Sequence, residues 1–279
     1  MIDVFFQFDF LKYSLYTAMM VGILTPAVGV FLVVRRLSLM ADALSHITLT
    51  GIAFSLLLGR SFPFFATLNP VYMGMLFSVT GSLAVSRLGL VFRHYKELAI
   101  PIILSSGIGI GVVFISLADG FNNDLLNYLF GSVAAVSRQD FYMMLVLLGG
   151  VILFIGLFYK ELLFLSFDEE QAVTSGIPKR FMDLSFMIVV AVVIGVSMQI
   201  VGILLVSALM TLPVAAAMRI AKSFKGMLFY SILIGEVSVL TGMVSAFHLD
   251  WAPGGTIVMT NLFILILIIM ITGLKRKWG

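Results

Sequence analysis

Apolar residues recur along the chain in long runs. Nine runs are long enough to cross a bilayer as helices, because a hydrocarbon core of about 30 Å needs roughly 20 residues at 1.5 Å each. Of the 279 residues, 61% are hydrophobic and 11% are charged, and the mean hydropathy is +1.14. The pattern predicts an all-α, polytopic membrane protein with a single transmembrane domain over 1–279. The expected spans are 11–34, 38–58, 67–86, 98–118, 140–159, 181–199, 202–220, 226–247 and 256–274.

The basic residues predict the orientation of these spans. With the N-terminus outside, only three of the 17 basic residues, Lys12, Arg60 and Arg138, fall on the outer side. All the others then lie in cytoplasmic connections or in the C-terminal tail, as the positive-inside rule requires. We therefore expect the N-terminus outside and the C-terminus in the cytoplasm.

The longest apolar run, 181–221, is predicted to be a hairpin of two spans. A single continuous helix would move Lys222, Lys225 and the basic C-terminal tail to the outer side, against the positive-inside rule. We therefore expect the chain to turn near residues 199–202.

The outer connection 119–139 mixes apolar and polar residues at helical spacing. It is too short for a further span and fits an interfacial or gate helix across the mouth of a pathway. The alternative is a plain connector anchored by Tyr128 and Phe130.

Two ionisable residues, Asp42 and His46, interrupt the apolar run 38–58. A carboxylate near the middle of a bilayer costs at least ~3 kcal/mol, so such residues mark functional sites. Residues four apart share a helix face, and a carboxylate beside an imidazole is a ligand pair for Zn²⁺ or Mn²⁺. The polar face of this predicted helix also includes Ser45. The alternative is a polar pair that only joins neighbouring helices.

Further candidates lie in the C-terminal half. Glu236 is a second carboxylate within a span; it is expected on the pathway or as the partner of a buried donor such as Arg219. Pro213 leaves the carbonyl of Leu209 without its helical donor. Thr211 is expected to bond that carbonyl, or to face a cavity together with Pro213. A packing kink explains Pro213 equally well.

The inner connection 161–180 encodes a short helix with both ends specified. Asp168 is a good N-cap residue, and Gln171 stands at the third helical position. Gly176 can adopt a left-handed C-terminal cap, and Pro178 prevents continuation. The alternative is a helical turn that merely bridges two spans. We interpret the capped helix 168–176 as an element that transmits force to a soluble partner.

Four motifs together resemble one protein family, the permease subunits of ABC transporters that import zinc, manganese or iron. The most specific motif, 35–46, is similar to the family's second-helix signature. The segment 167–172 with Gly176 resembles the family's coupling helix. The segments 202–217 and 253–258 are similar to later motifs.

The resemblance implies a permease homodimer in a prokaryotic plasma membrane, two cytoplasmic ATP-binding subunits, and an external metal-binding protein that delivers the ion. Residues 45–51 look more like the zinc branch, because the manganese branch more often has a proline where this chain has Thr50. The residues expected to contact the ATP-binding subunit are Asp168, Glu169, Glu170, Gln171, Ala172 and Gly176.

The resulting hypothesis is the permease of an ATP-driven importer of a divalent transition metal, zinc before manganese or iron. Two copies of Asp42 and His46 around a twofold axis would complete a ligand set. The chain has no phosphate-binding Gly-x-x-x-x-Gly-Lys-Ser/Thr motif, so partner subunits are expected to hydrolyse ATP. No permanent cofactor is expected, and the chain has no cysteine.

Two other classes of protein were compared with this hypothesis. In a proton-coupled secondary transporter, Asp42, His46 and Glu236 would relay protons, but such proteins usually carry internal repeats that this sequence lacks. An intramembrane metalloenzyme needs a His-Glu-x-x-His pair or an equivalent base, which is also absent.

Overall fold

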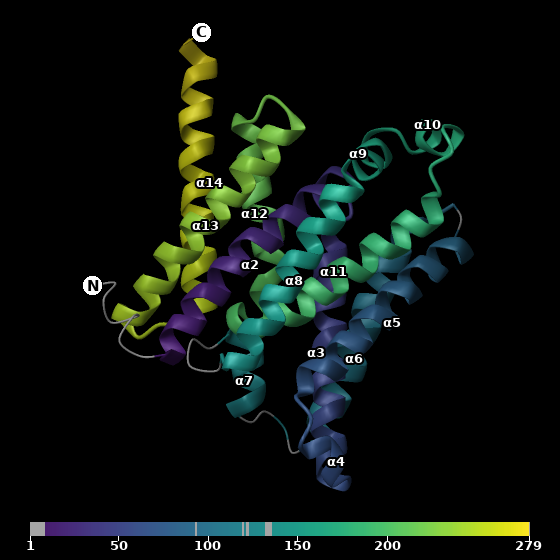
Figure 1. The fold of residues 1–279 in the computed structure, drawn as a ribbon, viewed down its shortest axis with the longest axis vertical. Helices are drawn as coiled ribbons and strands as arrows, with labels where there is room; N and C mark the ends of the chain where they lie inside the picture. The colour runs from purple at the N-terminus through teal and green to yellow at the C-terminus, as the bar shows by residue number, and fades with distance from the viewer. Residues whose placement is uncertain (1–8, 93, 119, 121–122, 132–135, 279) are drawn as a thin grey trace.

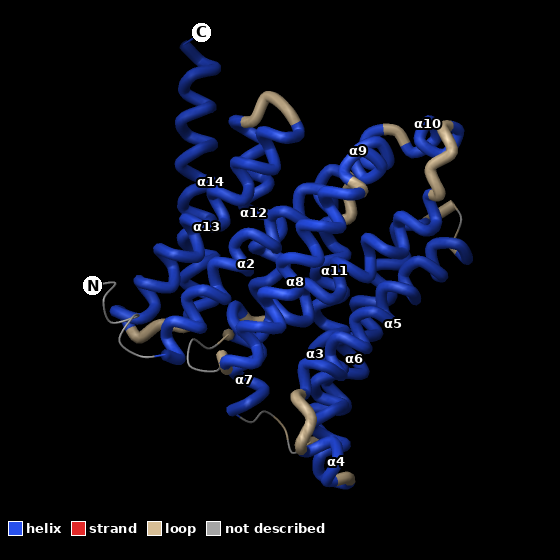
Figure 2. Tube along the Cα trace, in the orientation of Figure 1, coloured by secondary structure: helices blue, strands red, loops and turns tan. Residues whose placement is uncertain are grey.

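The protein is a bundle of helices. The computed structural model describes residues 9–92, 94–118, 120, 123–131 and 136–278. Within these ranges the regular structure is entirely helical, as the apolar runs predict (Figures 1 and 2).

In the described part of the chain, eight helices are long and apolar enough to cross a membrane. The ninth expected span, 202–220, corresponds to α12 (Ile203–Ile220), which is apolar but shorter. Its 18 residues rise about 27 Å, slightly less than the hydrocarbon core. The eight long helices are α2 (Asp9–Val34), α3 (Ser38–Ser61), α5 (Pro70–Val91), α6 (Ala99–Leu117), α8 (Arg138–Leu157), α11 (Lys179–Val201), α13 (Phe224–Leu249) and α14 (Pro253–Trp278).

Short helices fill the connections. The outer helix expected within 119–139 is present as α7 (Asn123–Phe130), and the capped inner helix is present as α10 (Glu169–Thr174). Residues 119, 121–122 and 132–135 lie outside the described residues. Three further short helices have no counterpart among the predictions: α4 (Pro63–Ala66), η1 (Lys96–Leu98) and α9 (Tyr159–Phe167).

The predicted turn in the run 181–221 occurs at a single residue. α11 ends at Val201 and α12 begins at Ile203, with Gly202 between them at φ +87°. A Cβ at Gly202 would lie 2.5 Å from the carbonyl oxygen of Leu129 in α7. Glycine is therefore required twice, for the backbone conformation and for the close approach of α7.

The connections separate to the two ends of the bundle. The turns that follow α2, α5 and α12 lie along the upper-right side of the molecule in Figure 1, together with α9, α10 and the C-terminal end of α14. The lower-left side holds α4, α7 and the connection from α13 to α14 (Figure 1), and Gly202 between α11 and α12 lies against α7 on the same side. All connections that the basic residues assign to the cytoplasm thus share one end.

α3 lies in the interior of the bundle. It packs against α5, α6, α11 and α12, and α2 and α3 are the most buried of the long helices. Small residues permit this packing: a Cβ at Gly51 would lie 2.6 Å from the carbonyl oxygen of Met73 in α5. Close approach at small residues is the usual way in which membrane helices associate.

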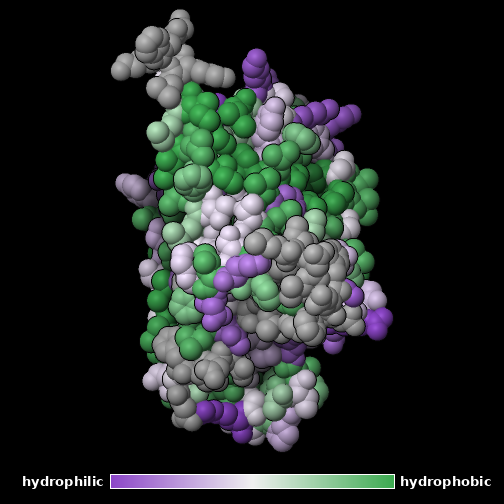
Figure 3. All heavy atoms as spheres, turned by 90° about the vertical axis from the view of Figure 1, so that its left-hand side faces the viewer, coloured by the Kyte–Doolittle hydropathy of each residue, from purple (hydrophilic) through white to green (hydrophobic). Residues whose placement is uncertain are grey.

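The outer surface of the bundle is hydrophobic. Figure 3 views the side formed by the C-terminal helices, and hydrophobic side chains cover most of its upper half. Met259, Phe263 and Met270 of α14 are exposed. This surface suits contact with lipid, whereas Asp42 and His46 lie on the interior helix α3.

Candidate functional site

The α3 helix carries Asp42 and His46 one turn apart. Both side chains are half-buried, and the carboxylate lies close enough for its charge to act on the imidazole. Within the described ranges, no group of three or more His, Asp or Glu side chains is close enough to hold a metal ion. A metal ion bound by this pair therefore requires further ligands, either of another kind or from a second copy of the chain.

Asp42 lines a groove of about 470 Å³ between α3 and α12. Three hydroxyl side chains line the same groove: Ser38 from α3, and Ser207 and Thr211 from α12. The remaining lining residues are Val33, Leu39, Ala208 and Ala215. The groove thus places one carboxylate and three hydroxyl groups around a common space, an arrangement of oxygen donors.

Thr211 lines this groove, and its hydroxyl does not donate a hydrogen bond to the carbonyl of Leu209. Its Oγ1 donates to the carbonyl oxygen of Ser207 at 3.0 Å and lies 3.4 Å from that of Ala208. The expected bond to the Leu209 carbonyl is therefore wrong. A hydroxyl that donates its proton to the backbone keeps its lone pairs for an ion.

Pro213 is buried inside α12, two residues beyond Thr211, and does not line the groove. The same part of α12 lies very close to α2. A Cβ at Gly29 would lie 2.0 Å from the carbonyl oxygen of Met210, so only glycine fits at that position. α12 thus packs in direct contact with α2 at the level of Met210.

His46, one turn beyond Asp42, is not among the residues that line the groove. On the α6 side, Thr50 Oγ1 donates to the carbonyl oxygen of Gly107 at 2.7 Å and lies 3.0 Å from that of His46. A Cβ at Gly111 would lie 2.9 Å from this Oγ1. Thr50 is therefore a packing residue of the α3–α6 contact and faces away from the groove.

The structure places Ser45 and Glu236 outside the groove. Ser45 is 2% exposed, and its Oγ has no hydrogen-bond partner among the described residues. Glu236 is half-buried on α13, where a Cβ at Gly22 of α2 would lie 2.9 Å from its Oε1. In the part of the chain that the structure describes, this oxygen has no hydrogen-bond partner, and Arg219 is exposed at the end of α12. The suggested pairing of Glu236 with Arg219 is not formed.

The α10 helix has both of the predicted caps. The backbone N–H of Gln171 donates to Asp168 Oδ1 at 2.9 Å, and Gly176 has φ +88°. Beyond the helix, the N–H groups of Gly176 and Ile177 donate to the carbonyls of Val173 and Ala172, which is a Schellman cap. Ala172 is buried.

The outward face of α10 is polar. Glu169, Glu170 and Gln171 are exposed, and Glu169 pairs with Lys179 at the start of α11. α10 therefore presents a rigid, polar surface at the upper end of the molecule (Figure 1).

A buried arginine near the groove has no counterpart among the predicted site residues. Arg35 precedes α3, and its side chain is 8% exposed. It donates to Asp183 Oδ1 of α11 at 2.9 Å and to Ser166 Oγ of α9 at 3.2 Å. Its guanidinium lies 5.1 Å from the ring centroid of Phe186. Burial lowers the pKa of Arg35, and the nearby Asp183 carboxylate opposes that shift.

The sequence profile of the ABC 3 transport family matches residues 7–272, which is almost the whole chain. The chain belongs to this family. The manganese import system permease protein ScaB of Streptococcus gordonii is 33% identical over 276 residues, covering 97% of this chain and 96% of the relative. The manganese transport system membrane protein MntC of Listeria innocua is 32% identical over 254 residues, covering 91% and 87%.

The fold of this ABC 3 family member is also similar to a solved structure. PsaBC from Streptococcus pneumoniae, in complex with Fab, shares 31% sequence identity at a TM-score of 0.83, covering 96% of this chain and 94% of that chain. The chain is thus a multi-pass membrane permease of an ABC-type metal importer.

Proposed function

We propose that this permease carries manganese through the groove at Asp42, driven by ATP hydrolysis on partner subunits. The observation that supports the proposal most strongly is the meeting of Asp42 with the hydroxyl groups of Ser38, Ser207 and Thr211. Carboxylate and other oxygen ligands suit Mn²⁺, and one imidazole from His46 is compatible with it. The relatives compared above are named for manganese transport.

The sequence favours zinc because Thr50 occupies a position where the manganese branch more often has proline. The side chain of Thr50 bonds the backbone of α6, so this difference concerns helix packing. It therefore gives no information on the ligands of the ion. Manganese takes the first place in the proposal, and zinc and iron follow it.

A second copy of the chain would complete the ligand set. Leu39, which lines the groove beside Asp42, is 58% exposed, so the groove reaches the surface of the protomer. Two copies of Asp42 and His46 facing each other across a twofold axis would supply two carboxylates and two imidazoles. Weak, shared ligation suits an ion that must also leave the site.

The other end of α3 would receive the ion. A pocket of about 460 Å³ at that end is lined by Ser55 and Arg60 of α3 and by Asn127 and Tyr128 of α7. An external metal-binding protein would deliver the ion at this end, and the ATP-binding subunits would contact α10 at the opposite end. α3 connects the two.

The proposal is tested by reconstituting the permease with its ATP-binding subunit in liposomes. Manganese uptake should require ATP, and zinc in equal concentration should be carried more slowly. Uptake driven by a proton gradient without ATP would contradict the proposal and favour a secondary transporter. Faster transport of zinc than of manganese would contradict the choice of metal.

A further inference from the structure

α9 contacts the two turns that end the walls of the groove. The first is the turn 35–37 between α2 and α3. Here Arg35 donates to Ser166 Oγ of α9 at 3.2 Å and to the carbonyl oxygen of Leu162 at 3.5 Å. Since Asp183 and Phe186 of α11 hold the same guanidinium, Arg35 fixes α9 and α11 to the start of α3.

The turn held by Arg35 is short and rigid. Arg36 has φ +59°, a conformation that non-glycine residues rarely adopt. The N–H groups of Arg36 and Leu37 donate to the carbonyls of Val33 and Leu32, which closes a Schellman cap on α2. α3 begins at the next residue, Ser38, which itself lines the groove. A displacement of Arg35 is therefore passed directly to the groove.

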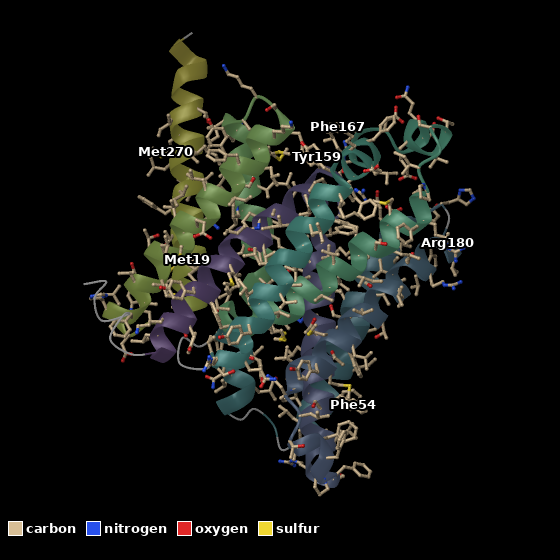
Figure 4. The ribbon with its side chains drawn as sticks, viewed as in Figure 1. Met19, Phe54, Tyr159, Phe167, Arg180 and Met270 are labelled. Carbon is tan, nitrogen blue, oxygen red and sulfur yellow. The ribbon has the colours of Figure 1, made fainter. Side chains whose placement is uncertain are left out.

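The second contact is aromatic and reaches the end of α12. Phe224 begins α13 directly after the turn 221–223 that follows α12. Its ring centroid lies 6.1 Å from that of Tyr159 and 6.0 Å from that of Phe167, the first and last residues of α9. Figure 4 labels Tyr159 and Phe167, which lie near one another in the upper part of the view. Phe224 also packs against Phe31 of α2 at 5.2 Å.

α9 is joined to α10 by a single residue. Phe167 ends α9, and the next residue, Asp168, is the N-cap of α10. A force applied to α10 therefore reaches Phe167 and Ser166 without passing through a flexible loop.

We infer that α9 transmits the movement of α10 to both walls of the groove, with Arg35 and Phe224 as the positioning residues. Arg35 joins α9 to the start of α3 through hydrogen bonds. Phe224 joins α9 to the end of α12 through its ring contacts with Tyr159 and Phe167 and through the turn 221–223 that precedes it. Movement of α9 changes the separation of the two walls and so opens or closes the space around Asp42. This inference rests on the proposed function, since it requires an ATP-binding subunit at α10.

The chain offers a direct reporter because it has no cysteine. Ala208→Cys places a thiol in the groove at a position that carries no proposed ligand. In the reconstituted complex, a methanethiosulfonate reagent should label this thiol at different rates with and without ATP plus vanadate. Arg35→Gln and Phe224→Ala should each remove that difference. Manganese carried per ATP hydrolysed should fall about tenfold, while ATP hydrolysis continues.

Matched control variants separate transmission from general damage. Arg36→Gln changes the neighbouring, exposed arginine, and Phe229→Ala removes an exposed ring from the same helix as Phe224. Both should retain nucleotide-dependent labelling and full coupling. Phe167→Ala guards against a failure to fold, because Phe167 is 69% exposed and its removal opens no core. It should reduce coupling as Phe224→Ala does.

The possible results distinguish failure of the α9 inference from failure of the proposed function. Nucleotide-dependent labelling and normal coupling in the Arg35→Gln, Phe224→Ala and Phe167→Ala complexes would overturn the inference. An equal loss in the two control variants would also overturn it. Failure of the unsubstituted complex to import manganese with ATP would instead contradict the proposed function.

Discussion

At the scale of single residues, the sequence identifies Asp42 and His46 because ionisable groups are rare in an apolar run. The sequence cannot identify the side chains that line the groove with Asp42. Ser207 is far from Asp42 along the chain, and serine is common in membrane helices. Thr211 was singled out beside Pro213, yet its hydroxyl bonds a different carbonyl from the one expected. Arg35 resembles an ordinary cytoplasmic base in the sequence, and only the fold reveals its contacts with α9 and α11.

Thr50 provides a prediction about metal preference. Thr50→Val keeps the shape of the side chain but removes its bond to the Gly107 carbonyl, which should cost about 1 kcal/mol of stability. The midpoint of thermal unfolding in detergent should fall, and the ratio of manganese to zinc uptake should not change. A changed ratio would show that Thr50 acts on the ion after all.

The ion pair of Arg35 with Asp183 provides a second prediction. Arg35→Met leaves the Asp183 carboxylate partly buried without its partner, and should destabilise the protein by about 3 kcal/mol. The double variant Arg35→Met/Asp183→Leu removes both charges and should be more stable than Arg35→Met alone. The measurement is the midpoint of thermal unfolding of the two purified variants. A lower midpoint for the double variant than for Arg35→Met would contradict this explanation of the ion pair.

At the scale of elements, the sequence predicts best where local chemistry sets both ends of a helix. α10 is such a case, since Asp168 and Gly176 act through their own backbone neighbours. The short helix α9 was missed because its apolar residues continue the pattern of the span before it. α4 was missed because Pro63 and the residues after it carry no distinct period. The distribution of charge predicts the turn near Gly202, but it does not reveal that this residue has a positive φ and lies against α7.

Two glycine substitutions test the cap of α10. Among the described residues, no atom outside the local backbone lies within 4 Å of a Cβ built at Gly176 or at Gly89 of α5, but only Gly176 has a positive φ. Gly176→Ala should therefore cost about 1 kcal/mol in backbone strain, while Gly89→Ala should stabilise α5 slightly. We expect the first variant to recover less ATP-binding subunit on co-purification, and the second to recover the normal amount. Equal recovery would contradict the coupling role of α10.

At the scale of the whole molecule, the sequence predicts the helical class, the long helices and the gathering of basic connections at one end. These properties follow from hydrophobicity and charge, which act over whole segments. The assembly is harder to predict, because a surface between two copies resembles a surface in contact with lipid. The exposed end of the groove at Leu39 is the feature that suggests where a second copy would lie.

Cross-linking in membranes tests the position of that second copy. Leu39→Cys should form a disulfide between two protomers under oxidation, because Leu39 is exposed beside the groove. Ala41→Cys and Leu157→Cys are matched controls, since Ala41 is fully buried and Leu157 is exposed on a different helix. Neither control should cross-link. Cross-linking at Leu157 and not at Leu39 would place the second copy elsewhere.

The most direct test of the account is ATP-dependent manganese uptake by the Asp42→Asn complex in liposomes. Asp250→Asn is the control, because it makes the same chemical change at an exposed residue with φ +55°, which asparagine tolerates. We expect Asp42→Asn to lower uptake at least about tenfold, as the loss of an ion ligand should, while Asp250→Asn transports normally. Normal uptake by Asp42→Asn would contradict the claim that the ion passes through this groove.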